Sequence, residues 1–166
     1  MKTSQKLISA IFALALMAAP AAGQQPAKSG KYMGKLAGHL PGSVEQTYEL
    51  EKDHVFVLGP FHGVFLNDVA DGFLDKTEVV CPRALDIVGG KIVSGHGYCI
   101  MTDKDGDKAF LVWEVNDPTG KGGGNFKWTG GTGKYTGLQG NNAFHGAGIG
   151  KTGAGLIVWE GDWRLP

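Results

Sequence analysis

The sequence has few cysteines, no excess of either charge and only one long apolar run, and each shortage narrows the range of functions. Its 166 residues include 2 cysteines, 16 Lys and Arg, and 16 Asp and Glu, so the formal net charge is zero. A balanced charge with no basic patch argues against nucleic acid and anionic membranes as partners. The one long apolar run lies near the N-terminus and is too short to predict a membrane span.

Helical periodicity is also missing. Beyond residue 23, no stretch sustains a period of 3.6 residues over three turns. Short apolar runs alternate instead with turns rich in the 28 glycines. This spacing predicts an all-β fold with little or no helix, either a sandwich or a closed antiparallel barrel. Closure is the favoured arrangement, because a barrel leaves no strand edge open to unwanted pairing.

The first 23 residues have the pattern of a secretory signal peptide. Lys2 and Lys6 precede an apolar run, and the segment ends in small residues at 21–23. We therefore expect a secreted or periplasmic protein that is not attached to a membrane after processing. Residues 24–30 are predicted to be a flexible tail, and residues 31–166 a single barrel domain.

The two cysteines flank a predicted hairpin. A three-residue loop at 89–91 would place Cys81 opposite Cys99 on the same face. A two-residue Gly89-Gly90 loop would place Cys81 opposite Tyr98, and Cys99 would then point away unless a bulge restored the register. An exported protein favours oxidation, so we predict a Cys81–Cys99 disulfide through the first register or its bulged equivalent. It would stabilise the fold by about 3 kcal/mol in the chain-entropy model.

The remaining strands follow from short runs of apolar or alternating residues. Residues 44–51 alternate with a period of two, although a capping box at Ser43 and Gln46 would also suit a helix. Gly59-Pro60 separates the next two runs. We predict strands at residues 44–51, 54–58, 61–66, 73–81, 91–102, 108–115, 125–129 and 156–159.

Three motifs suggest a metal or a nucleotide but lack the required spacing. The acidic loop 103–107 has no glycine at the sixth position of a calcium loop, and its Asp-Gly pair predicts a hairpin turn. Residues 146–152 resemble a phosphate-binding loop but are one residue short, and no helix pattern follows. His62 and His145 lack the spacing of zinc ligands. We therefore predict neither a cofactor nor a metal site.

One glycine-rich segment carries a family resemblance. Residues 130–140 read Gly-Gly-Thr-Gly-Lys-Tyr-Thr-Gly-Leu-Gln-Gly and follow a hydrophobic meander that ends in Trp-Glu. This resembles the Gly-Gly-Thr-Gly-x-aromatic-x-Gly-x-x-Gly signature of the allene oxide cyclase-like and dirigent-like barrels, and the chain looks like a secreted bacterial branch of that superfamily. The resemblance implies an eight-stranded antiparallel barrel, a trimer, and an apolar lumen that steers reactive small molecules. It transfers no catalytic carboxylate to a numbered position.

Four polar residues of the meander are the candidates for a site. Ser94, His96 and Tyr98 share one face of the predicted strand 91–102, while Glu78 and Glu114 lie on neighbouring strands. Such a cluster could transfer protons or bind a polar head group. The simpler interpretation, which we favour, places His96 and Tyr98 on the outer face and leaves Glu114 in solvent. If the lumen holds a ligand, however, the sequence favours contact with His96 and Tyr98 over contact with the disulfide, because residues 95, 97 and 99 form a face of small side chains. The candidate catalytic residues are Glu78, His96, Tyr98 and Glu114.

Three functions remain open. The favoured one is an exported barrel that binds an apolar small molecule in its lumen. The second is a cyclase or isomerase of the resembled families. A secreted inhibitor or structural protein is the third. Aromatic lining with one ionisable group or none would favour binding, whereas an inward carboxylate paired with His or Tyr would favour catalysis.

Overall fold

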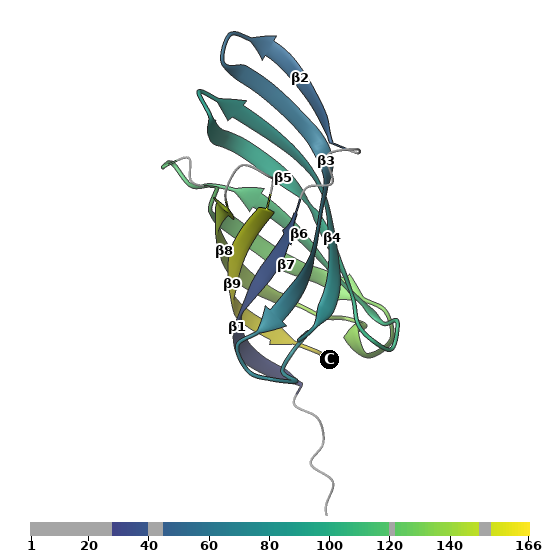
Figure 1. Ribbon diagram of the computed structural model, residues 1–166. Helices are drawn as coiled ribbons and strands as arrows, with labels where there is room; N and C mark the ends of the chain where they lie inside the picture. The colour runs from purple at the N-terminus through teal and green to yellow at the C-terminus, as the bar shows by residue number, and fades with distance from the viewer. Residues whose placement is uncertain (1–27, 40–44, 120–121, 150–153) are drawn as a thin grey trace, which may run out of the picture.

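The computed structural model describes residues 28–39, 45–119, 122–149 and 154–166, with 147–149 described by backbone only (Figure 1). Strands account for most of these residues, and no helix among them is long and apolar enough to cross a bilayer. The elements are β1 (Ser29–His39), β2 (Gln46–Glu51), β3 (His54–Asn67), β4 (Thr77–Val88), β5 (Lys91–Thr102), β6 (Lys108–Val115), β7 (Gly124–Gly131), η1 (Gly133–Tyr135), β8 (Gly140–Ile149) and β9 (Ala154–Arg164).

Eight of the described strands form a closed antiparallel barrel. The order around the sheet is β1-β9-β8-β7-β6-β5-β4-β3, and β1 also pairs with β3, which closes the ring. The remaining strand, β2, pairs only with β3 and lies outside the ring. In Figure 1 the β2–β3 and β4–β5 hairpins project beyond one end of the barrel. The predicted all-β, eight-stranded barrel is confirmed.

Strand β3 is longer than the sequence predicts, because it serves both the barrel and the projecting hairpin. Its first half pairs with β2 and its second half with β1. The sequence predicts a break at Gly59-Pro60, but the strand runs through this pair. Pro60 lies opposite Pro82 of β4, so two residues without an N–H donor share one rung of the ladder. The missing hydrogen bonds are therefore confined to one place.

Strand β1 is not predicted from the sequence, because its inward side includes glycines. A Cβ at Gly34 would collide with the ring of Phe65, and a Cβ at Gly38 would collide with the carbonyl oxygen of His62. Glycine at these positions lets β1 approach β3 closely enough to close the barrel. The strand starts at Ser29, so residues 29 and 30 belong to the barrel rather than to the predicted tail. Residues 1–27, which include the predicted signal peptide, lie outside the described residues.

The β4–β5 hairpin closes with two residues rather than the three predicted. Gly89 and Gly90 form the turn with φ of 57° and 75°, the left-handed values that a tight hairpin needs. A bulge near Asp86 then shifts the register by one residue, and Val93 is the extra residue. The shift restores the alignment of the two cysteines.

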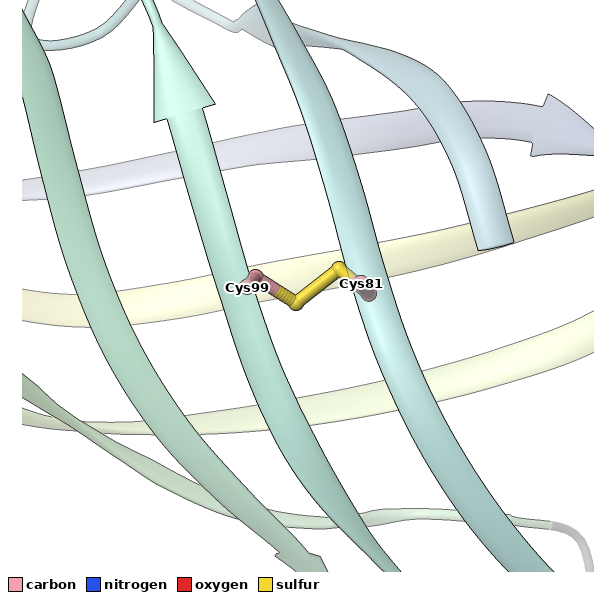
Figure 2. Close-up of a disulfide and its surroundings, with 2 residues drawn as sticks. All are labelled: Cys81 and Cys99. Carbon is pink, nitrogen blue, oxygen red and sulfur yellow. A yellow bond between two sulfur atoms is a disulfide. The ribbon is translucent and has the colours of Figure 1, made fainter. Parts of the chain in front are cut away.

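The predicted disulfide is confirmed. Cys81 of β4 and Cys99 of β5 are bonded, with their Cα atoms 4.1 Å apart, and Figure 2 shows the bond spanning the two neighbouring strands. Both residues are buried, at 4% and 3% exposure respectively. Since side chains alternate along a strand, the bond identifies the face of β4 and β5 that points into the barrel.

The core consists of inward-facing residues from every side of the ring. A group of aromatic rings fills the part of the barrel near the start of β1 and the end of β9, and neighbouring ring centroids lie 5.0 to 6.2 Å apart. Burial raises the pKa of Tyr32 far above its ordinary value, so its hydroxyl remains protonated. The rings of this group belong to Tyr32, Phe65, Phe126, Trp128 and Trp159.

The acidic loop 103–107 is the hairpin turn predicted, and a lysine from the glycine-rich segment forms ion pairs with two of its carboxylates. The ammonium group of Lys134 lies 2.6 Å from Asp103 Oδ2 and 2.9 Å from Asp105 Oδ2. Burial alone would raise the pKa of Asp103, but its hydrogen bonds, that from Lys134 first, outweigh burial and hold the pKa below its ordinary value. The glycine-rich segment is thus fastened to the β5–β6 turn.

Replacing both cysteines with serine should lower the free energy of unfolding by about 3 kcal/mol, because the unfolded chain loses the constraint of a closed loop. Urea denaturation followed by tryptophan fluorescence measures the difference. The wild type, denatured without reductant, should also show no thiol that reacts with a maleimide. Two reactive thiols in this sample would contradict the disulfide.

The inward face can be tested with neighbouring residues of β5. A Cβ at Gly97 would collide with the carbonyl oxygen of Pro82 and lie 2.9 Å from the Trp113 ring, whereas Tyr98 is 61% exposed. We expect Gly97→Ala to destabilise the fold by about 1–3 kcal/mol. Tyr98→Thr, which keeps a β-forming residue on the surface, should change stability by no more than about 0.5 kcal/mol. The opposite ranking in urea denaturation would mean that the faces are reversed.

Candidate functional site

A cavity of about 110 Å³ lies inside the barrel and is the candidate site. Its walls are almost entirely apolar, and they come from strands on all sides of the ring. Ile92 of β5 and Gly122, just before β7, place it toward the end where the β4–β5 hairpin projects. The lining residues are Leu36, Phe61, Cys81, Arg83, Leu85, Ile92, Cys99, Leu111, Trp113, Val115, Gly122, Phe126, Phe144, Ile157 and Trp159.

The disulfide forms part of this wall. Cys81 and Cys99 both line the cavity, and Leu111 lies directly opposite Cys99 on β6. Two strands held together here cannot separate or slip, so this part of the wall keeps its shape. The bond therefore supports the cavity as well as the fold.

The aromatic rings of the core close the cavity at the end away from the β4–β5 hairpin. Phe126 and Trp159 line it and also contact each other, with ring centroids 5.0 Å apart. On the side away from the cavity, Phe126 packs edge-on against Trp128. The lumen is thus filled with side chains near the start of β1 and the end of β9, and it is open toward the end where the β4–β5 hairpin projects.

Arg83 is the one ionisable side chain among the described residues that line the cavity. It follows Cys81 by two positions on β4, so the two side chains point to the same face. Its Nη2 donates to Glu45 Oε2 at 2.7 Å, and the two side chains are only 13% and 24% exposed. Burial lowers the pKa of Arg83, and the charge of Glu45 opposes that shift, so the guanidinium remains charged.

The four candidate residues from the sequence lie on the outer surface. Glu78, His96, Tyr98 and Glu114 are all exposed, which confirms the favoured interpretation that His96 and Tyr98 face outward. The further expectation that these two residues, rather than the disulfide, would contact a ligand in the lumen is wrong. The reason is the alternation of side chains: Gly97 and Cys99 point inward, so His96 and Tyr98 point outward.

Two of the four candidates do lie next to each other. His96 and Glu114 are opposite each other on β5 and β6. They line an open groove on the outer wall, which crosses onto β7, β8 and β9. Glu78 lies opposite Thr102 at the other end of β5, so the structure does not bring all four together.

No metal centre is evident among the residues that the structure describes. The described part of the chain contains no group of three or more His, Cys, Asp or Glu side chains placed to hold an ion. The cavity offers apolar contact and one guanidinium, which suits a small organic molecule better than a charged cofactor.

Sequence reasoning missed Arg83, although a signal for it was present. Val79, Cys81 and Leu85 are buried on the inward face of β4, and Arg83 interrupts this apolar series. Once the disulfide is assigned to the inside, an arginine two positions away must also point inward. A lone charge on the buried face of a strand is rare unless it is paired.

Comparisons with known proteins show the fold of this chain, but they do not assign it to a family by sequence similarity. No protein-family model and no curated protein matches the chain. Solved structures do match over most of its length, among them two dirigent proteins. The pterocarpan synthase dirigent protein GePTS1 has 8% identity and a TM-score of 0.51, covering 85% of this chain and 88% of that one. The pterocarpan synthase dirigent protein PsPTS1 has 10% identity and a TM-score of 0.54, covering 84% and 97%. This chain therefore has the dirigent-like barrel fold that its glycine-rich segment resembles.

Proposed function

We propose that this protein is an exported barrel that binds a small apolar molecule in its lumen. The observation that carries the proposal is the cavity of about 110 Å³ with apolar walls at the open end of the barrel. An engineered apolar cavity of about 150 Å³ binds benzene, whereas drug-sized ligands occupy about 300–1,000 Å³. The cavity therefore suits one ring or a short chain.

The size of the ligand also sets the expected affinity. Burying about 150 Å² of apolar surface at about 25 cal/mol per Å² contributes roughly 4 kcal/mol. If association cost nothing, that free energy would correspond to a dissociation constant near 1 mM. The loss of translational and rotational freedom makes binding weaker than this limit. A bare ring should bind weakly, and a natural ligand needs further contacts to bind tightly.

Binding is favoured over catalysis by the groups that line the cavity. The matched structures are pterocarpan synthases by name, so a cyclase or isomerase is the alternative function. Acid–base chemistry on a bound molecule needs a carboxylate, imidazole or phenol within hydrogen-bond reach. Among the described lining residues the only ionisable group is Arg83, which remains protonated and is a poor proton-transfer group.

Export and self-association are further parts of the proposal. A buried disulfide and a dirigent-like fold are consistent with an oxidising compartment outside the cytoplasm. A homo-oligomer, a trimer by resemblance, would bury exposed apolar side chains on the outer wall, such as Val64 and Ile100. A secreted inhibitor or structural protein would use the same surface but would not need the cavity.

Ethylbenzene should bind to the wild-type protein with a dissociation constant of about 1 mM or weaker, because the cavity accepts one ring and apolar burial limits the affinity. Shifts of the Ile92 and Leu111 methyl signals in ¹H–¹³C NMR measure it. Ile92→Trp should abolish binding by filling the mouth of the cavity, whereas Tyr98→Thr on the outer wall should leave it unchanged. If ethylbenzene does not move the lumen methyl signals, or if Tyr98→Thr weakens binding as much as Ile92→Trp, the proposal is wrong.

A further inference from the structure

The guanidinium of Arg83 at the edge of the cavity indicates that the ligand carries a polar group as well as an apolar part. A guanidinium carries five N–H donors arranged in a fork. In Arg83, Nη2 donates to Glu45, while the Nε–H is buried and has no hydrogen-bond partner. Buried polar groups are almost always paired, so an unpaired donor on a residue that lines a cavity indicates where a ligand oxygen would bind.

The negative charge of Glu45 determines which ligand charge the cavity can accept. Its carboxylate lies 2.7 Å from Nη2 and neutralises the guanidinium. An anionic ligand would have to give up water, enter apolar walls and approach this second negative charge. A cation would meet the guanidinium. A neutral group that accepts a hydrogen bond avoids both costs.

We infer that the Arg83–Glu45 pair selects neutral ligands that carry an acceptor oxygen, such as a carbonyl, an ether or a phenol, on a ring or short chain. This inference rests on the proposed function, since it concerns the polar end of the same cavity. The apolar walls hold the ring, and the free donor of Arg83 fixes its orientation by one charge-assisted hydrogen bond.

Three probes of nearly equal size separate the contributions. Acetophenone, ethylbenzene and benzoate each carry one ring and differ in the group that would meet Arg83. In wild-type protein, acetophenone should bind about tenfold more tightly than ethylbenzene, because its carbonyl pairs the buried donor. Benzoate should not bind measurably. Shifts of the Ile92 and Leu111 methyl signals in NMR titrations report each dissociation constant.

Two variants test the role of each partner. Glu45→Gln leaves the guanidinium without its counter-ion, so benzoate should become the tightest of the three probes. Arg83→Met combined with Glu45→Gln removes both charges, and acetophenone should then bind no more tightly than ethylbenzene. A ¹H–¹⁵N spectrum of each variant with wild-type dispersion shows that it is folded, and the ranking in wild type tests the inference without any variant.

The outcomes distinguish this inference from the proposed function. If acetophenone and ethylbenzene bind equally to wild type, or if benzoate binds most tightly, the selection by Arg83 and Glu45 is wrong although the lumen still binds small molecules. If none of the three probes moves the lumen signals, the proposed function itself is wrong. The predicted ranking in wild type, with its reversal in Glu45→Gln, supports both.

Discussion

The bond between Cys81 and Cys99 determines which face of the central strands points into the barrel. Successive side chains of a strand point to opposite faces, so one inward residue settles the direction of its neighbours. From Cys81 the alternation places Arg83 in the lumen, and from Cys99 it places His96 and Tyr98 on the outer wall. The chemistry of the cavity depends on this choice, because the reverse arrangement would line it with imidazole and phenol.

Closure of the ring produces the cavity. Glycines on β1 let it pack against β3 where any larger residue would collide with the neighbouring strand. The aromatic side chains near the start of β1 and the end of β9 then fill one part of the lumen and leave the part beside the β4–β5 hairpin open. The site results from a barrel that is only partly filled, with a single ion pair at its edge.

Much of the architecture could be predicted from the sequence, whereas the site could not. The bounds of β5 and β6 were predicted from their apolar runs, and the disulfide from the hairpin with its bulged register. Strand β1 was missed because glycine hides its inward pattern, and β3 and β4 were cut short because proline usually ends a strand. Arg83 was not predicted as a site residue, because the inward and outward faces of β4 can be distinguished only after the disulfide is placed. Glu45 was not predicted because its contact with Arg83 joins residues that are 38 positions apart in the chain.

The most direct test of the account is the position of a bound ring relative to the wall of the barrel. Nuclear Overhauser effects between acetophenone and the methyl groups of isotope-labelled protein measure it. We predict contacts from the ring to Leu111 and Ile92, which line the cavity, and none to Val64 or Ile100, which are exposed on the outer wall. Contacts to Val64 or Ile100 without contacts to Leu111 would contradict a ligand site inside the barrel.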